Sequence, residues 1–349
     1  MSFVEASIVE GNGYTIVEDA SLAGRNTFRV PAKTDLLIDV RKSAALAEVF
    51  AFPYLRNKPL LILGEGSNLL FTRDWPGVVL VFAALGIRVL EDHGDAALVR
   101  AEAGENWNDF VRWTLAKGFI GLENLTLIPG TVGASPIQNI GAYGREVREF
   151  IHTVEAWDRE SKSLLRLDNA ACEFGYRDSL FKRHGDRYVI TAVEWRLPRS
   201  GALRTDYAGV AEEIAAMGVE TNALTVAEAV ARLRTRKLPN PALIGNAGSF
   251  FKNPIVPRDV AEALKSEHAA LPVYPAETGM AKLSAAWLIE AQGFKGQRDG
   301  DAGVSEQHAL VLVNHGHATG AQIWALAERI RTATLQRFGV ELEAEPRIL

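Results

Sequence analysis

The chain has 349 residues, of which 48% are hydrophobic, a formal net charge of −5 and one cysteine, Cys172. A chain of this length and apolar content buries a large core and favours two or more domains. The scattered basic residues and negative net charge exclude a field suited to nucleic acid or to an anionic membrane. A single cysteine excludes an internal disulfide, and neither a membrane-spanning run nor a signal peptide is evident. We therefore expect a soluble, cytoplasmic protein.

The first half of the chain is rich in short predicted strands. They cover residues 60–63, 78–82, 87–90 and 97–103, between glycine or charged turn residues. The apolar spacing in "ENWNDFVRWTLAKGF" predicts a helix that ends at Gly118. Strands return at 151–157, 163–167 and 188–197, and the polar stretch "RSGALRTDYAG" predicts a connection between domains.

The second half is predicted to be α+β. "TVAEAVARLRTRK" and "TGAQIWALAERIRTATLQRFG" have helical periodicity, and the second closes on Gly339. Further helical stretches are expected at 260–266 and 281–291, with a buried strand in "ALVLVN". The final "VELEAEPRIL" is too rich in strand-forming residues for a tail, so we expect a strand that pairs with an earlier sheet.

The stretch "LLILGEGSNLLF", residues 60–71, is a strand that leads into two glycines. A Rossmann unit needs a third glycine and an amphipathic helix, but Ser67, Asn68 and Leu69 follow Gly66, and Pro76 with Gly77 closes the segment. We therefore reject a Rossmann fold. The remaining prediction is a loop whose backbone N–H groups lie close to a ligand, most often an anion.

A second glycine-rich loop, "NLTLIPGTVGASPIQNIGAYG", covers residues 124–144. Its glycines and prolines forbid regular structure, yet its leucine, isoleucine, valine and tyrosine residues are typical of a buried segment. Buried irregular backbone has N–H groups that need acceptors, which a nucleotide cofactor with phosphates and an apolar ring would supply. The alternative is an internal Ω-loop packed for its own sake.

Three shorter motifs carry polar side chains. Arg177 in "FGYRDSLFK" lies between an aromatic residue and an aspartate, and taken alone it is best interpreted as a surface-turn arginine paired with a nearby carboxylate. Ser249 in "GNAGSFFKNP" lacks the flanking glycines of a nucleophile elbow and an evident activating base, so it is predicted to donate a proton. In "RLRTRKLPNP" the cations suit a helix C-terminus, and Lys237 could also meet a phosphate. The histidines of "NHGH" lack further metal ligands and are interpreted as loop residues.

Taken in order, these motifs resemble the UDP-N-acetylenolpyruvoylglucosamine reductase family. The resemblance is carried by "LILGEGSNLL", "GLENLTLIPGTVGASPIQNIGAYG", "FGYRDSLFK", "RTRKLPNP", "GNAGSFFKNP", "HALVLVN" and "LEAEPR". It implies an α+β protein with a two-subdomain FAD-binding region of the vanillyl-alcohol-oxidase (PCMH) type and a C-terminal α+β substrate domain. The implied boundaries are 1–200 for the FAD-binding domain, with subdomains of about 1–85 and 86–200, then 205–340 for the substrate domain and 341–349 for a terminal strand returning to the active site.

The resemblance also implies a reaction and a set of residues. NADPH reduces bound FAD, and the enolpyruvyl ether of UDP-GlcNAc is then reduced to UDP-N-acetylmuramate for peptidoglycan synthesis. Ser249 matches the family's proton donor, and Arg177 and Glu345 match the pair that stabilises the charged intermediate. The positions matching the cofactor site are Gly64, Gly66, Ser67, Asn68, Pro129, Gly130, Val132, Gly133, Ser135, Gln138, Asn139, Gly141, Ala142, Tyr143 and Arg347. Those matching the substrate site are Tyr176, Tyr207, Lys237, Asn253 and His308.

The sequence departs from the family pattern at three positions. His308 stands where some members have glutamine, "DYAG" replaces a more usual Tyr-Gly-Asp around Tyr207, and Pro346 removes a backbone donor from the last strand. The alternatives are another FAD-dependent oxidoreductase of the same fold and a non-catalytic sugar-nucleotide-binding protein. The implied partners are the small-molecule substrate and NADPH, with no metal, nucleic acid or membrane, and the chain is expected to be a monomer.

Overall fold

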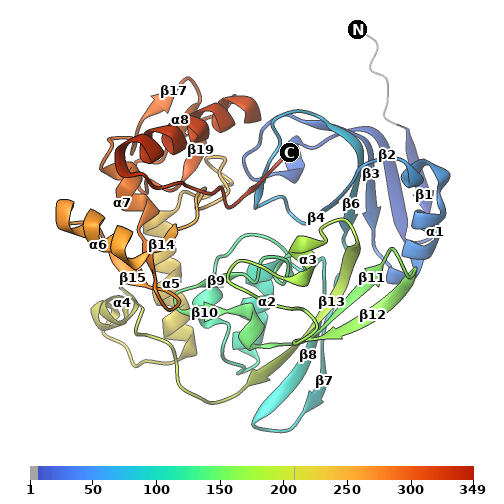
Figure 1. The fold of residues 1–349 in the computed structure, drawn as a ribbon. Coiled ribbons are helices and arrows are strands. Elements are labelled where there is room, and N and C mark those ends of the chain that lie inside the picture. Colours follow the sequence, from blue (N-terminus) through green and yellow to red (C-terminus); the bar gives the residue numbers. More distant parts are fainter. Residues whose placement is uncertain (1–6, 208) are drawn as a thin grey trace. The chain divides into compact units, whose positions relative to one another are not determined.

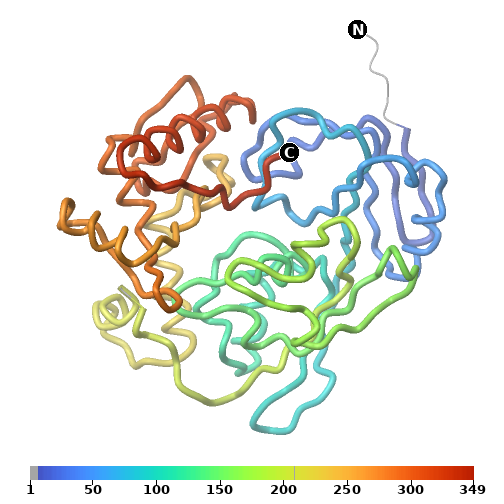
Figure 2. The backbone as a smooth tube through the Cα atoms, in the orientation of Figure 1, coloured from blue at the N-terminus to red at the C-terminus, as the bar shows by residue number. Residues whose placement is uncertain are grey.

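The computed structural model describes residues 7–207 and 209–349 (Figure 1, Figure 2). The chain divides into two compact units. Unit 1 contains Met1–Ala20, Thr34–Glu65 and Trp75–Arg234, and unit 2 contains Ser21–Lys33, Gly66–Asp74 and Thr235–Leu349. Each unit is therefore assembled from three separate stretches of chain.

The first sheet of unit 1 is mixed. In spatial order it contains β1 (Ile8–Gly11), β2 (Tyr14–Ser21), β3 (Lys33–Val40), β6 (Trp75–Phe82) and β4 (Leu60–Leu63). Strands β3 and β4 run parallel to β6, and helix α1 (Leu46–Ala51) lies in the connection between them. The strand β4 leads directly to Gly64, so the sheet fixes where the first glycine loop begins.

The second sheet of unit 1 is entirely antiparallel. Its order is β12 (Ser163–Asp168), β11 (Ile151–Asp158), β13 (Tyr188–Pro198), β8 (Ala96–Glu102) and β7 (Ile87–Asp92). Helix α2 (Trp107–Ala116) follows β8, and the Trp107 and Phe110 rings lie 5.5 and 5.3 Å from the ring of Trp195 on β13. These buried aromatic rings join α2 to one face of the sheet within a single apolar core.

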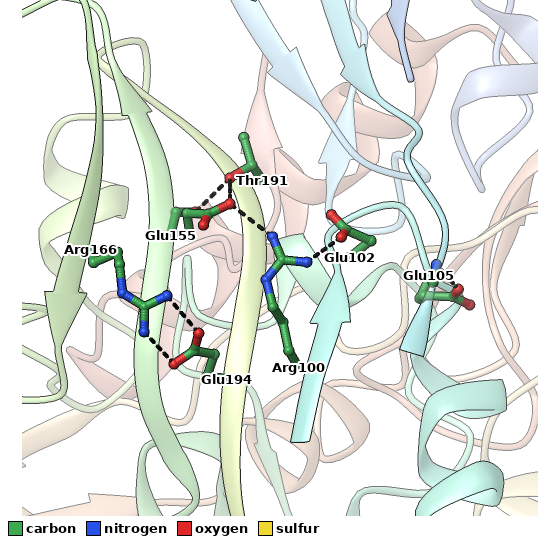
Figure 3. Close-up of polar contacts among 8 residues, drawn as sticks. Arg100, Glu102, Glu105, Glu155, Arg166, Thr191 and Glu194 are labelled. Carbon is green, nitrogen blue, oxygen red and sulfur yellow. Dashed lines mark hydrogen bonds and ion pairs between the residues drawn. The ribbon is translucent and has the colours of Figure 1, made fainter. Parts of the chain in front are cut away.

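The opposite face of this sheet carries paired charges (Figure 3). Because successive residues of a strand point to opposite faces, Glu194 points away from the face that carries Trp195. Arg166 on β12 donates two hydrogen bonds of 2.7 Å to the Glu194 carboxylate, whose side chain is almost fully buried. Arg100 on β8 is paired with both Glu102 and Glu155.

The remainder of unit 1 contains short elements and a helical pair. The short elements are β9 (Gly141–Ala142), β10 (Arg145–Glu146) and α3 (Leu180–Arg183), and the helical pair is α4 (Val210–Met217) and α5 (Ala223–Lys237), whose last three residues belong to unit 2. Valine, isoleucine and leucine side chains of α4 and α5 form a separate small core against which Tyr143 packs. The glycine-rich loop of residues 124–144 therefore contacts this helical pair.

Unit 2 consists of small sheets and helices. Two three-stranded sheets contain β14 (Ile255–Pro257), β16 (Met280–Leu283) and β15 (Val273–Pro275), and β17 (Arg298–Asp299), β18 (Ala302–Val304) and β19 (Leu312–Asn314). The helices are α6 (Arg258–Glu267), α7 (Ala285–Glu290) and α8 (Gly320–Phe338). Thr319 caps α8 through a capping box with Gln322, and Gly339 ends it with a left-handed φ of 65°. A third pairing joins β20 (Arg347–Ile348) in parallel to β5 (Leu69–Leu70).

Two predictions about local structure need correction. The helix expected at 281–291 begins only at Ala285, because β16 occupies Met280–Leu283 and the Ser284 side chain caps α7 by accepting a hydrogen bond from Trp287 N. The strand expected over the last ten residues is regular only at Arg347–Ile348, although Ala344 also bridges Phe251. Among the described residues, no helix is long and apolar enough to cross a bilayer.

Candidate active site

Glycines allow the two predicted cofactor loops to pack tightly within unit 1. A Cβ atom on Gly64 would lie 3.1 Å from Thr131 Oγ1, and one on Gly133 would lie 2.5 Å from Ala103 Cβ. The distance of 2.5 Å is shorter than any normal contact between non-bonded carbon atoms. A larger residue at position 133 would therefore push the backbone away from Ala103. The sequence therefore places glycine where segments of backbone must approach each other closely.

The second glycine-rich loop is irregular and largely buried, as its composition predicts. Val132 and Asn139 are fully buried, and Asn139 adopts a left-handed φ of 45°. Its side-chain amide donates to Gly175 O at 2.9 Å, and Asn124 Nδ2 donates to Tyr143 O at 2.9 Å. These buried amides hold the loop in one conformation by satisfying carbonyl groups that regular structure would otherwise pair.

Arg177 lies against this loop. Its backbone has a left-handed φ of 54°, and its Nη2 donates to Gly141 O at 2.6 Å. The guanidinium also lies over the ring of Tyr176, with 5.4 Å between the guanidinium carbon and the ring centroid. A non-glycine residue in this backbone region stores strain, which is a feature of positions whose side-chain direction matters. Unit 1 thus brings the predicted catalytic arginine to the predicted cofactor loop.

Unit 2 brings together Ser249 and Glu345. Ser249 bridges Val311, and the next residue, Phe250, accepts a hydrogen bond from Glu345 N at 2.8 Å. Gly248 supplies a left-handed φ of 69° immediately before the serine. The two predicted catalytic residues of unit 2 therefore lie on adjacent extended segments, and Ser249 is half-buried.

The second glycine of the first loop begins the unit 2 part of the predicted cofactor site. A Cβ atom on Gly66 would lie 2.0 Å from Arg25 O, and its φ of 69° is left-handed. Asn68 O accepts from Arg347 N at 3.0 Å, and Asn68 Nδ2 donates to Glu345 O at 3.4 Å. The predicted cofactor residues Asn68 and Arg347 are therefore neighbours of the predicted catalytic Glu345 (Figure 2 shows the chain end meeting this early segment).

The predicted substrate residues occur in both units. In unit 1, the Tyr143 and Tyr207 rings lie 5.4 Å apart in an edge-to-face arrangement, and Tyr176 is exposed. In unit 2, Lys237 ends α5, and Asn253 Oδ1 accepts from Ala285 N at 3.0 Å, so this amide also supports the start of α7. Asn253 is therefore held in a fixed orientation.

His308 is held in its neutral form. Burial lowers the pKa of its imidazole, and the positive charges of Lys237 and Lys295 lower it further. Its Nδ1 accepts a hydrogen bond from Leu310 N at 3.2 Å, which leaves the proton on Nε2. The departure from glutamine at this position therefore retains a neutral hydrogen-bonding group.

Two polar residues near the loops were missed by the sequence analysis. Burial lowers the pKa of the Arg234 guanidinium, and its Nε is buried with no hydrogen-bond partner. The helical sequence gave no signal that separates this arginine from its exposed neighbours. Glu65 lies between the two glycines of the first loop and accepts hydrogen bonds from Asn106 and Gly130. A lone glutamate in a loop carries no pattern that would predict this.

The remaining candidates have structural explanations. Burial raises the pKa of the Cys172 thiol to about 12, so the thiolate is not populated at neutral pH. The backbone N–H groups of His315 and His317 both donate to Asp301. Among residues 7–207 and 209–349, no group of three or more His, Cys, Asp or Glu side chains is placed to hold a metal ion.

Comparison with known proteins first defines the class. Residues 34–167 match the family model of an FAD binding domain, so the chain is a flavoprotein. The residues of unit 1 fit that cofactor, because two buried polar atoms beside the second glycine-rich loop, Asn124 Oδ1 and Arg234 Nε, have no hydrogen-bond partner among the described residues. Residues 240–349 match the model of the UDP-N-acetylenolpyruvoylglucosamine reductase C-terminal domain.

Curated relatives then identify the family. A UDP-N-acetylenolpyruvoylglucosamine reductase of Xanthomonas oryzae pv. oryzae (strain PXO99A) is 53% identical over 97% of each chain. One of Xanthomonas campestris pv. campestris (strain 8004) is 52% identical over 96% of this chain and 97% of the relative. The chain belongs to the UDP-N-acetylenolpyruvoylglucosamine reductase family. A crystal structure of this reductase from Thermus caldophilus covers 99% of both chains with a TM-score of 0.66 at 21% identity, which confirms the predicted fold.

The family, the α+β fold with its FAD-binding region and the FAD cofactor are thus confirmed. The enzyme class predicted from the motifs is confirmed with them. The domain boundaries and the roles of the individual site residues stay predictions.

Proposed function

We propose that this enzyme reduces UDP-N-acetylenolpyruvoylglucosamine to UDP-N-acetylmuramate, with NADPH as the reductant, as a monomer in the cytoplasm. The arrangement that best supports the proposal is the placement of Ser249 and Glu345 on hydrogen-bonded neighbouring segments, next to the Asn68 loop. The identity of 53% over nearly the whole length of a reductase supports the same substrate.

The cofactor loops would hold FAD through their backbone. Gly64 and Gly133 allow segments of backbone to pack closely around these loops. Glycine-rich loops of this kind present N–H groups that suit a pyrophosphate. Bound FAD would supply the hydride for the vinyl methylene carbon of the substrate, with NADPH as the source of that hydride. The protein must then stabilise the negative charge that develops on the adjacent carbon and on the substrate carboxylate.

Arg177, Glu345 and Ser249 are assigned to that step. The planar guanidinium of Arg177 can pair with a carboxylate through two N–H groups, which stabilises enolate charge. Glu345 is assigned to the same step, because its backbone N–H donates to Phe250 O and so keeps its segment next to Ser249. The Ser249 hydroxyl transfers its proton to the charged carbon, completing the addition of two hydrogens across the double bond. Tyr176, Tyr207, Lys237, Asn253 and His308 are assigned to the sugar nucleotide.

The test separates the two half-reactions in Ser249→Ala. Bleaching of the yellow flavin by NADPH should proceed at the wild-type rate, because the serine takes no part in it. Reoxidation by the enolpyruvyl substrate should slow by on the order of 100-fold or more, since a proton donor is lost. Stopped-flow absorbance measures both rates on one preparation.

Ser266→Ala is the matched control, because Ser266 is an exposed serine on α6 in the same unit. Its two half-reactions should equal those of the wild type. Equal slowing of both half-reactions in Ser249→Ala would contradict the assigned role. A colourless protein that FAD does not reconstitute would contradict the proposed function itself.

A further inference from the structure

Glu65 occupies a paradoxical position, because it places a carboxylate inside a loop assigned to an anionic cofactor. It lies between Gly64 and Gly66, where a negative charge would repel a pyrophosphate. Both of its carboxylate oxygens are engaged within unit 1. Oε1 accepts from Asn106 Nδ2 at 2.9 Å, and Oε2 accepts from Gly130 N at 3.1 Å.

These two bonds join three segments of chain that are far apart in the sequence. Gly130 belongs to the second glycine-rich loop, and Asn106 is the N-cap of α2. Asn106 uses its two amide atoms differently, since Oδ1 accepts from Asp109 N at 3.1 Å while Nδ2 donates to Glu65. The cap therefore fixes the orientation of the amide that meets the glutamate.

The second loop is already attached to the α2 side by backbone bonds. Trp107 N donates to Gly130 O, and Val132 N donates to Glu105 O, both at 2.9 Å. Asn106 and Thr131 form an isolated bridge between the same segments. Next to Gly64, by contrast, the contact with Thr131 is one of close packing. The side chain of Glu65 therefore supplies hydrogen bonds that connect the first loop to the second.

We propose that Glu65 is a positioning residue that holds the two FAD loops in register before the cofactor binds. The proposal rests on the assignment of both loops to FAD. Preorganised loops bind more tightly because less ordering is required on binding, and here that gain outweighs the repulsion from one exposed carboxylate.

The two explanations of Glu65 predict different changes in the Kd for FAD when the residue is replaced by alanine. If Glu65 acts only as a nearby negative charge, Glu65→Ala binds FAD as tightly as the wild type or more tightly. If it positions the loops, Glu65→Ala raises the Kd of the apoprotein for FAD about tenfold, as expected for two lost hydrogen bonds to a partly solvated carboxylate. Glu65→Gln retains one acceptor oxygen, so its Kd should lie between those of the wild type and the alanine variant.

A double-mutant cycle distinguishes positioning from a general loss of structure. Asn106→Ser retains a good N-cap for α2 but lacks the amide that reaches Glu65. The effects of Asn106→Ser and Glu65→Ala on the FAD Kd should be less than additive, because they break the same link. Additive effects, or an alanine variant whose Kd is unchanged or lower, would overturn the proposal.

Flavin fluorescence quenching on titration of apoprotein measures each Kd without substrate. Glu262→Ala is the control for removing one exposed carboxylate, because Glu262 lies on the exposed side of α6. Its Kd should match the wild type. If the wild-type apoprotein itself fails to bind FAD, the assignment of the loops and the proposed function fail together. If the wild-type apoprotein binds FAD and the Glu65 and Asn106 variants bind it with the same Kd, the positioning role is wrong but the proposed function stands.

Discussion

Two regions of unit 1 differ in whether their buried polar and charged groups have partners within the protein. On the charged face of the second sheet, Arg100 pairs with the carboxylates of Glu102 and Glu155, and Arg166 pairs with that of Glu194 (Figure 3). Around the second glycine-rich loop, buried polar atoms lack hydrogen-bond partners: Glu123 Oε1, Asn124 Oδ1, Arg145 Nε and Arg234 Nε.

This difference indicates a structural role for the charges of the sheet and a ligand-binding role for the groups around the loop. A buried polar group without a partner costs free energy, so each one marks a position where a ligand or an ordered water would add a favourable contact. Among the described residues of the sheet, two neutral indole N–H groups, those of Trp157 and Trp195, are also in this state, but no charged group is. The paired charges of the sheet need nothing further from outside the protein. The unpaired groups lie beside the loop assigned to the cofactor, which is where a ligand would supply partners.

The largest change in unfolding free energy is expected from Arg100→Leu, which breaks the charge pairs of the second sheet. This removes the cation between two carboxylates whose side chains are 24% and 12% exposed. The unfolding free energy should fall by about 3 kcal/mol, because two poorly solvated negative charges lose their partner. Denaturant titration measures the loss.

Arg88→Leu is the matched control, because Arg88 is an exposed arginine directly opposite Arg100 on the neighbouring strand. Its unfolding free energy should change by no more than about 0.5 kcal/mol. An equal loss in both variants would show that arginine at this face matters for packing rather than for charge pairing.

Arg234→Met changes one of the buried groups that lack a hydrogen-bond partner, and it is expected to raise the unfolding free energy rather than lower it. Burial already lowers the pKa of this guanidinium, and within the described residues it has no ion pair with a carboxylate. The apoprotein should therefore gain on the order of 1 kcal/mol in unfolding free energy, because an apolar side chain of similar length carries no desolvation cost.

The same variant should lose affinity for an anionic ligand. If the buried cation is retained for FAD or for the sugar nucleotide, the Kd for that ligand rises about tenfold or more. Apoprotein denaturation and ligand titration measure the two effects separately. A variant that is less stable and binds both ligands normally would remove Arg234 from the binding role.

The same contrast explains how far sequence alone could lead. Motifs such as "GNAGSFFKNP" and "LEAEPR" identified the family and singled out Ser249 and Glu345 as candidates. This was possible because a motif consists of residues that are close together in the sequence. Burial is not local. Arg232, Arg234 and Arg236 look alike on a helix, but only the second has a buried Nε without a partner. The role of Glu65 likewise depends on Asn106 and Gly130, which no pattern around residue 65 encodes. At 281–291, helical periodicity did not reveal that Lys282 pairs with both Ile255 and Tyr274 in a sheet.

The smallest effect is expected at Glu123, and it depends on pH. Burial raises the pKa of this carboxyl above its ordinary value of 4.5, against the opposing effects of hydrogen bonds from Gly121 N and its own backbone and of the charge of Arg145. A raised folded-state pKa means that the native protein holds the proton more tightly than the unfolded chain. Stability from this group is therefore full below pH 4.5 and is lost as pH rises through the folded-state pKa.

Glu123→Gln keeps a neutral side chain of the same shape at every pH, so that loss should disappear. Relative to the wild type, the Tm of the apoprotein variant should rise with increasing pH above 4.5 by about 2 °C in total, as thermal unfolding followed by circular dichroism would show. Glu262→Gln, at an exposed site, should keep the wild-type pH dependence. A variant whose Tm falls relative to the wild type as pH rises would mean that Glu123 is ionised and stabilised by Arg145, and the loop would then belong with the paired charges of the sheet.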